Sequence, residues 1–268
     1  MMKSARIFLT SILIITFYGC ATGYGSQYVK PPERPAIQHV YQEQDKIVAY
    51  FEVNNINEYQ KLIPNIFRMP PRPLCRVSVI DFYDMVSGPP YLESSIEILI
   101  KYPGAPGEKE TLGWYCLMMP VTTEEALWGR FYWGFNKVRG KVTLERYEDK
   151  YIGTSFAPGR ETPYFKLNLE VEKDELTADQ KSFLGFVSPI PALTIKDGRV
   201  LNWGATGGGK YKIYEFEKVA PRIWKVKFGG GSIEYPKDPQ NYLTRMDLGK
   251  FIAGYWLKQR YKYSLAPK

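Results

Sequence analysis

The amino-acid sequence predicts a mainly β protein with a few short helices, built as one domain behind an export leader. Runs of β-branched and aromatic residues recur along the chain, separated by clusters of Gly, Pro and Asp. Helix start signals are few, and each precedes only a short apolar stretch. Because 44% of the 268 residues are hydrophobic and no second linker interrupts the chain, we expect a single large domain over residues 36–268.

Nine segments have the composition of strands, and several alternate polar and apolar residues. The expected strands are 46–53, 75–83, 95–102, 111–119, 141–147, 163–172, 191–203, 210–219 and 222–228. Gly229–Gly231 follows the last of these and predicts a turn, because glycine permits unusual backbone angles. The run 246–263 fits a helix and a strand equally well on periodicity alone.

Three short helices are predicted from capping pairs, in which a side-chain oxygen accepts from a backbone N–H in the first turn. Asn55 with Glu58 starts a helix that ends near Pro64. The other two pairs are Thr122 with Glu125 and Thr177 with Gln180.

Residues 1–19 predict a signal peptide, since two basic residues precede an apolar run, 7–18, that is too short to cross a bilayer as a helix. The run ends at Gly19 and Cys20, as in bacterial lipoprotein signals whose cysteine takes the lipid. Tyr18 fits that signal poorly. Ordinary cleavage after Gly19 or Ala21 and an uncleaved anchor therefore stay open as alternatives.

Residues 20–35 are rich in Gly, Ser and Pro and predict a tether. We therefore expect an exported protein of the bacterial periplasm or cell envelope, attached to a membrane through lipid on Cys20. The formal charge of +8 is spread along the chain without a long basic run, so we expect no nucleic-acid partner. The charge can still attract an anionic substrate or lipid headgroup.

Several kinds of chemistry are disfavoured by the residues present. His39 is the only histidine and lies beside the tether, which leaves a Ser/His/Asp or Cys/His mechanism without a base. No CxxC, HExxH or EF-hand spacing occurs, so we expect no required metal. Gly204–Lys210 matches part of a P-loop, but Tyr211 follows where Ser or Thr is needed, which favours a hairpin turn. Cys75 and Cys116 allow either a disulfide or two buried thiols.

The segment 128–140, TrpGlyArgPheTyrTrpGlyPheAsnLysValArgGly, is the most informative of the chain. It places Lys137 just after five aromatic residues, an unusually apolar setting for a lysine. Most such lysines lay the stem on the rings and keep the ammonium in water, which is the alternative to a reactive amine.

This segment resembles the acetoacetate decarboxylase family, in which a GlyArg pair precedes GlyPhe or GlyTyr, Pro and a Schiff-base lysine. The matching residues are Gly129, Arg130, Gly134, Phe135 and Lys137, with Asn136 in place of the proline. Upstream, TyrLeuGluSerSer at 91–95 is similar to the family segment that bears an active-site glutamate, here Glu93. Segments 191–200 and 228–235 also match the family's order and spacing.

The resemblance implies a curved, mostly antiparallel β-barrel or sheet domain, with Lys137 as nucleophile in its interior cavity. A lysine amine attacks a carbonyl only when neutral, and burial in an apolar pocket favours that form. Glu93 is then expected to position substrate or move a proton. The resemblance implies no organic cofactor, and homo-oligomers occur in the family.

Several family positions differ. Val138 stands where the decarboxylases have a second lysine, and Ser78 stands at a second acidic position. The substrate-carboxylate arginine aligns near Asp45 and Lys46, and Lys46 supplies the charge without the planar fork.

Other residues near the lysine complete the expected substrate-binding set. It comprises Arg130, Lys46, Phe135 and Trp133, and Arg139 is a further candidate cation.

Two functions follow from these features. The first is a Schiff-base-forming protein that acts on a small β-keto acid or related carbonyl compound, as a carbon–carbon lyase if it decarboxylates. The second is a non-catalytic envelope lipoprotein that keeps the fold to bind a small molecule, which export favours because the familiar decarboxylases are cytoplasmic.

Overall fold

The computed structural model describes residues 38–85, 88–104, 109–173, 176–203, 214–216 and 219–267. The predicted signal peptide, Cys20 and the whole predicted tether lie outside these residues, as does Gly204–Lys210. Among the residues described, no helix combines the length and the apolar character needed to cross a bilayer.

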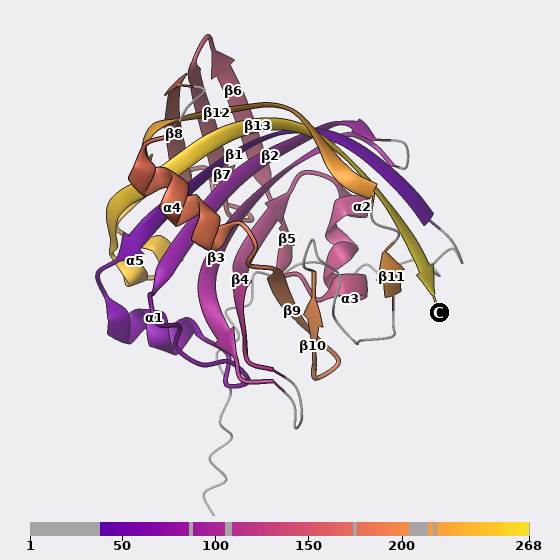
Figure 1. Ribbon diagram of the computed structural model, residues 1–268, viewed down its shortest axis with the longest axis horizontal. Helices are drawn as coiled ribbons and strands as arrows, with labels where there is room; N and C mark the ends of the chain where they lie inside the picture. Colours follow the sequence, from indigo (N-terminus) through magenta and orange to yellow (C-terminus); the bar gives the residue numbers. More distant parts are fainter. Residues whose placement is uncertain are drawn as a thin grey trace, which may run out of the picture.

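The described strands join in one curved sheet (Figure 1). They are β1 Gln38–Val53, β2 Leu74–Met85, β3 Tyr91–Tyr102, β4 Thr111–Val121, β5 Lys137–Arg139, β6 Lys141–Tyr147, β7 Lys150–Phe156, β8 Phe165–Lys173, β9 Ala192–Lys196, β10 Arg199–Asn202, β11 Tyr214–Phe216, β12 Val219–Glu234 and β13 Leu248–Pro267. Their order is β10-β9-β4-β3-β2-β1-β13-β12-β8-β7-β6, with β5 also on β4 and β11 also on β13.

The mainly β fold is confirmed, and the structure specifies its topology further. Strand β4 pairs in parallel with β5 and β9, whereas all other named pairs are antiparallel. The hydrogen-bonded order runs from β10 to β6 without closing. The sheet is therefore a curved, mixed sheet and not a closed antiparallel barrel.

Five short helices connect or cover the strands: α1 Ile56–Leu62, α2 Glu124–Leu127, α3 Gly129–Trp133, α4 Ala178–Val187 and α5 Tyr242–Met246. The capping predictions at Asn55 and Thr177 are confirmed, the latter as a full capping box. The cap of α2 is Thr123, one residue later than predicted. The Thr122 hydroxyl instead accepts a 2.9 Å hydrogen bond from Leu92 N of the neighbouring strand.

The predicted turn at Gly229–Gly231 is wrong, because these glycines lie within β12 and pair with β8. A Cβ atom on Gly229 would overlap the carbonyl oxygen of Glu170, so close approach of the two backbones requires glycine there. The C-terminal run, ambiguous from periodicity, consists mainly of β13 after the short α5.

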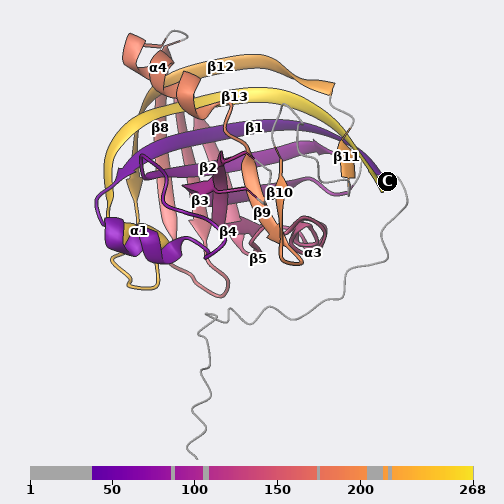
Figure 2. The same ribbon diagram turned by 60° about the horizontal axis from the view of Figure 1, so that its bottom comes forward.

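The curvature folds β6–β8 across one face of β1–β4 (Figures 1 and 2). The main core lies between these layers and includes Ile47, Val79, Ile96 and Leu167. Cys75 and Cys116 are buried free thiols, so for this pair the alternative without a disulfide is the correct one.

Residues of opposite parity on β1–β4 face away from the main core. Two smaller apolar clusters cover parts of this second face. One contains Tyr50 and Trp114 under α4, and the other contains Met119, Val121 and Leu127 beside α2.

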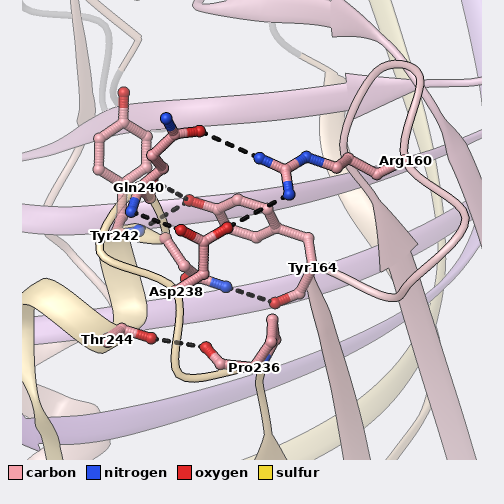
Figure 3. A network of polar contacts seen from close by, with 8 residues as sticks. Arg160, Tyr164, Pro236, Asp238, Gln240, Tyr242 and Thr244 are labelled. Carbon is pink, nitrogen blue, oxygen red and sulfur yellow. Dashed lines mark hydrogen bonds and ion pairs between the residues drawn. The ribbon is translucent and has the colours of Figure 1, made fainter.

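A polar network fixes the entry to α5 (Figure 3). Arg160, on the loop after β7, donates a 3.0 Å hydrogen bond to Gln240 Oε1 and pairs with Asp238 at 3.4 Å. The hydroxyl of Tyr164 accepts a 2.7 Å hydrogen bond from the backbone N–H of Tyr242. These contacts tie the β7–β8 connection to the segment that follows β12.

Candidate active site

Lys137 is positioned by the turn that ends α3. Gly134 ends this helix with φ 71°, a left-handed conformation that favours glycine. Asn136 then donates a 2.7 Å hydrogen bond to the backbone oxygen of Cys116, and its own backbone oxygen accepts from Met119 N at 2.9 Å. Asn136, which stands where the family that the segment resembles has proline, thus anchors the start of β5 to β4.

The stem of Lys137 passes directly over Gly129. A Cβ atom there would lie 3.0 Å from Lys137 Cε, so the glycine of the GlyArg pair leaves room for the lysine. The next residue, Val138, packs against the main core and not beside Lys137 Nζ.

Lys137 and Glu93 form a buried ion pair. Lys137 Nζ lies 2.7 Å from Glu93 Oε2, and the two side chains are 6% and 9% exposed. The ring of Tyr91 lies 5.6 Å from the same nitrogen. The structure therefore brings together the two residues predicted as catalytic, in a setting that excludes most water.

A second buried ion pair lies along the same strand. Arg76 of β2 contacts Glu97 of β3 through two parallel hydrogen bonds of 2.6 and 2.8 Å. Burial and charge oppose each other in this pair, and the Arg76 charge holds the pKa of Glu97 below its usual value. The guanidinium also lies over the ring of Trp114, 4.6 Å from its centroid.

Two serines occupy the space between the ion pairs. Ser78 and Ser95 stand opposite each other on β2 and β3, with hydroxyl oxygens 2.8 Å apart. Ser95 also donates to Glu97 at 3.2 Å. Because the Ser95 proton is directed to a carboxylate, Ser78 must donate to Ser95. The Ser78 oxygen then remains available as a hydrogen-bond acceptor.

Lys46, on β1, lies on the same face of the sheet as these polar residues. It stands opposite Ile80, which stands opposite Glu93, so the three side chains share one face of the sheet. Lys46 is partly exposed and forms no ion pair or hydrogen bond with any side chain of the described chain. Burial, and next the Arg76 charge, lower its pKa to about 8.

Asp45 points to the opposite face, where it pairs with Arg146 at 2.9 Å. Asp81 contacts the same guanidinium at 2.8 Å. Asp45 and Lys46, the two residues near the expected arginine position, thus lie on opposite faces of the sheet. Only Lys46 lies on the face that carries the two ion pairs.

The remaining predicted site residues lie around the aromatic turn. Phe135 packs beside Met119, Val121 and Leu127 and also contacts Trp203, with ring centroids 5.5 Å apart. The ring of Trp133 meets that of Trp203 edge-on, with centroids 6.2 Å apart. Phe135 and Trp133, both predicted site residues, therefore pack against Trp203.

Arg130 and Arg139 are exposed. Neither joins the two buried ion pairs, whose partners are fully accounted for by Glu93 with Lys137 and Glu97 with Arg76. Arg76 is therefore a cation of the site that was not predicted from the sequence. The sequence does carry a signal for it, because Arg76 and Glu97 each place a charge inside an apolar strand run.

These residues form a polar cluster, which comprises Lys46, Arg76, Ser78, Glu93, Ser95, Glu97 and Lys137. Three of these residues are cationic and two are carboxylates, so the set carries one excess positive charge when all are ionised. Such a site is suited to an anionic ligand with a carbonyl group beside Lys137.

The chain belongs to the acetoacetate decarboxylase family, whose model, described as Acetoacetate decarboxylase (ADC), matches residues 26–264. No curated protein sequence matches significantly. Among solved structures, acetoacetate decarboxylase from Legionella pneumophila is similar with a TM-score of 0.63 at 15% identity, covering 89% of this chain and 90% of that chain. A second acetoacetate decarboxylase structure gives 0.66 at 16% identity, covering 89% and 93%.

A further similar structure is the enduracididine biosynthesis enzyme MppR complexed with pyruvate. It gives a TM-score of 0.57 at 11% identity and covers 91% of this chain and 92% of that chain. At these identities the structural comparisons establish the shared fold alone.

Proposed function

We propose that this protein forms a Schiff base between Lys137 and a small keto acid or related carbonyl compound. The observation that carries the proposal is the buried contact of Lys137 Nζ with Glu93 Oε2, at 2.7 Å, in a chain of this family. A carboxylate at this distance can accept the ammonium proton and leave the neutral amine that attack requires.

The steps follow from that proton transfer. The neutral amine of Lys137 adds to the carbonyl carbon, and the carbinolamine loses water to give a protonated imine. With a β-keto acid, the bond to the carboxylate then breaks toward the imine, which releases carbon dioxide and leaves an enamine. The proton that Glu93 took from the ammonium is used to expel the hydroxyl group as water, so Glu93 takes up another proton from solvent and delivers it to the enamine carbon. Water then hydrolyses the imine to regenerate the lysine.

An α-keto acid would follow a different course. Its carboxylate is attached directly to the imine carbon, so electrons from that bond cannot be delocalised into the imine. The adduct would keep its carboxylate and remain available for aldol or dehydration chemistry. The similar structure of MppR with bound pyruvate makes this substrate class worth testing.

Exchange of carbonyl oxygen with solvent tests the proposal directly. Imine formation and hydrolysis replace the ketone oxygen with oxygen from water, so acetoacetate and pyruvate should gain label in ¹⁸O-water faster with protein than without it. We expect Lys137→Gln to remove most of the acceleration, with Arg139→Gln as an exposed control on the same strand. Release of carbon dioxide from acetoacetate by the unsubstituted protein would establish decarboxylation as a separate step.

A non-catalytic binding function is the second candidate, and the resting ion pair favours it. Lys137 and Glu93 already satisfy each other, and the excess cation can hold an anion without covalent chemistry. Saturable binding of a keto acid without oxygen exchange would support this function.

We also propose that the domain is exported and attached to a membrane by lipid on Cys20. The proposal rests on the basic start, the short apolar run and the Gly19–Cys20 junction. Metabolic labelling with a radioactive fatty acid should label the protein, and Cys20→Ser should remove the label. Unlabelled protein in the soluble periplasmic fraction would contradict the anchor.

A further inference from the structure

The two ion pairs leave Lys46 as the excess cation of the polar cluster. Glu97 is engaged by the Arg76 fork through two hydrogen bonds, and Glu93 is engaged by Lys137. Neither carboxylate is left over to neutralise Lys46. An unpaired ammonium in a partly desolvated site is the group whose charge is most easily lost.

The surroundings of Lys46 support this assignment. The charged groups that face it are Arg76 on β2 and Glu93 and Glu97 on β3. On β13 it stands opposite Leu257, an apolar residue. Repulsion from Arg76 and the loss of water both favour the neutral amine, and together they outweigh the two carboxylates to bring the pKa of Lys46 to about 8.

We propose that Lys46 is a second carbonyl-reactive amine of the polar cluster, able to condense with a small ketone or aldehyde independently of Lys137. The neutral amine adds to the carbonyl carbon, and loss of one water gives an imine that is protonated at nitrogen. The proposal assigns to Lys46 a covalent role beyond electrostatic attraction of a carboxylate. It does not require Lys137 to be the nucleophile.

The geometry gives the two amines different resting states. The Lys137 ammonium is held by a carboxylate at 2.7 Å and must first transfer its proton. The Lys46 amine has no such partner in the described chain, and its neutral fraction is set by solvent pH. At pH 7 a lysine with a pKa near 8 is about one-tenth neutral, whereas an ordinary lysine is neutral to less than about one part in a thousand.

Reductive alkylation with acetone and cyanoborohydride at pH 7 tests the proposal. The reductant delivers hydride to the protonated imine carbon and leaves a stable secondary amine, which peptide mass mapping locates. We expect Lys46 to be alkylated more than about tenfold faster than Lys181 and Lys250, two exposed lysines that serve as internal controls. The Lys46 rate should level off above about pH 8, while the control rates continue to rise.

The same experiment on the double variant Lys137→Gln/Glu93→Gln separates the two lysines, because it removes Lys137 without leaving Glu93 as a free carboxylate beside Lys46. Rapid alkylation of Lys46 in this folded double variant supports the proposal. Alkylation of Lys46 no faster than Lys181 in the folded unsubstituted protein overturns it, and labelling of Lys137 alone overturns it while leaving the proposed function intact. Circular dichroism of each sample verifies that the protein is folded.

Discussion

Lys137 Nζ and Glu93 Oε2 lie 2.7 Å apart although their strands, β5 and β3, flank β4 on opposite sides. The contact depends on the parallel pairing of β5 with β4, which places Lys137 level with Met119. Since both partners are buried, each is the only counter-ion that the other has in direct contact among the described residues.

Removing one partner of this pair should destabilise the protein. Lys137→Ala leaves the Glu93 carboxylate buried and unpaired, and we expect a loss of about 3–5 kcal/mol in the free energy of unfolding. Urea unfolding measures the loss. The double variant Lys137→Gln/Glu93→Gln should recover much of it, while Arg139→Ala, at an exposed position of β5, should change stability by less than about 0.5 kcal/mol.

Glu93 should matter for the reaction more than for binding. Glu93→Gln keeps the shape of the side chain but cannot accept the ammonium proton, so we expect carbonyl-oxygen exchange to slow by on the order of 100-fold or more. Glu145→Gln, at an exposed position of β6, is the control. An exchange rate within a factor of two of the unsubstituted protein would show that Glu93 moves no proton in the slow step.

Arg76 and Glu97 should behave as one energetic unit. Either Arg76→Gln or Glu97→Gln alone leaves a buried charge and should cost about 3–5 kcal/mol, and the double variant should cost much less than the sum. A double-mutant cycle from urea unfolding measures the coupling. Additive losses would contradict the bidentate pair seen in the structure.

The glycines of β12 provide a matched test of the strand register. A side chain at Gly229 would overlap Glu170 O, whereas a side chain at Gly230 would meet no atom within 4 Å. We expect Gly229→Ala to destabilise the protein by about 3 kcal/mol or more and Gly230→Ala to be nearly neutral. Equal melting temperatures for the two variants would show that β12 does not pair with β8 in this register.

Asp45 should limit stability at neutral pH. Burial raises its pKa more than the nearby charge of Arg146 lowers it, so the folded state favours the protonated acid. Stability is therefore greatest at low pH with respect to this group and falls as pH rises through the raised pKa. Asp45→Asn should therefore stabilise the protein at pH 7, because it removes the buried charge while Asp81 still pairs with Arg146.

A urea series from pH 4 to pH 7 measures this effect. The advantage of Asp45→Asn should shrink as pH falls toward the ordinary aspartate pKa of 3.8, because the carboxyl then becomes protonated in the unfolded as well as the folded state. A variant that is less stable than the unsubstituted protein at pH 7 would show that the Arg146 contact outweighs burial.

Local sequence signals predicted much of the fold. Alternation and β-branched composition located most of the long strands, and the capping pairs located α1 and α4 closely. Strand β7 was missed because Gly153 interrupts its composition. A Cβ atom at Gly153 would lie 2.6 Å from Val79 Cγ2 and 2.9 Å from Ile47 Cδ1, so this glycine serves packing between layers that no local pattern records.

The site was predictable only in part. Resemblance selected Lys137 and Glu93, which the fold brings together, and it also selected Lys46, which stands near the family's arginine position and can supply its charge. Arg76 and Glu97 were missed because a charged residue in a strand is ordinarily expected to face solvent. Only the register that sets Arg76 opposite Glu97, and Ser78 opposite Ser95, shows that these polar side chains share one buried face.

The central claim is that the amine of Lys137 forms an imine, and borohydride reduction in the presence of acetoacetate or pyruvate tests it most directly. We predict that peptide mass mapping will find the reduced adduct on Lys137, with the mass of the keto acid or its decarboxylated ketone, less water and plus two hydrogens. Absence of any adduct on Lys137 from either compound, in protein that is folded and exposed to saturating ligand, would contradict the claim.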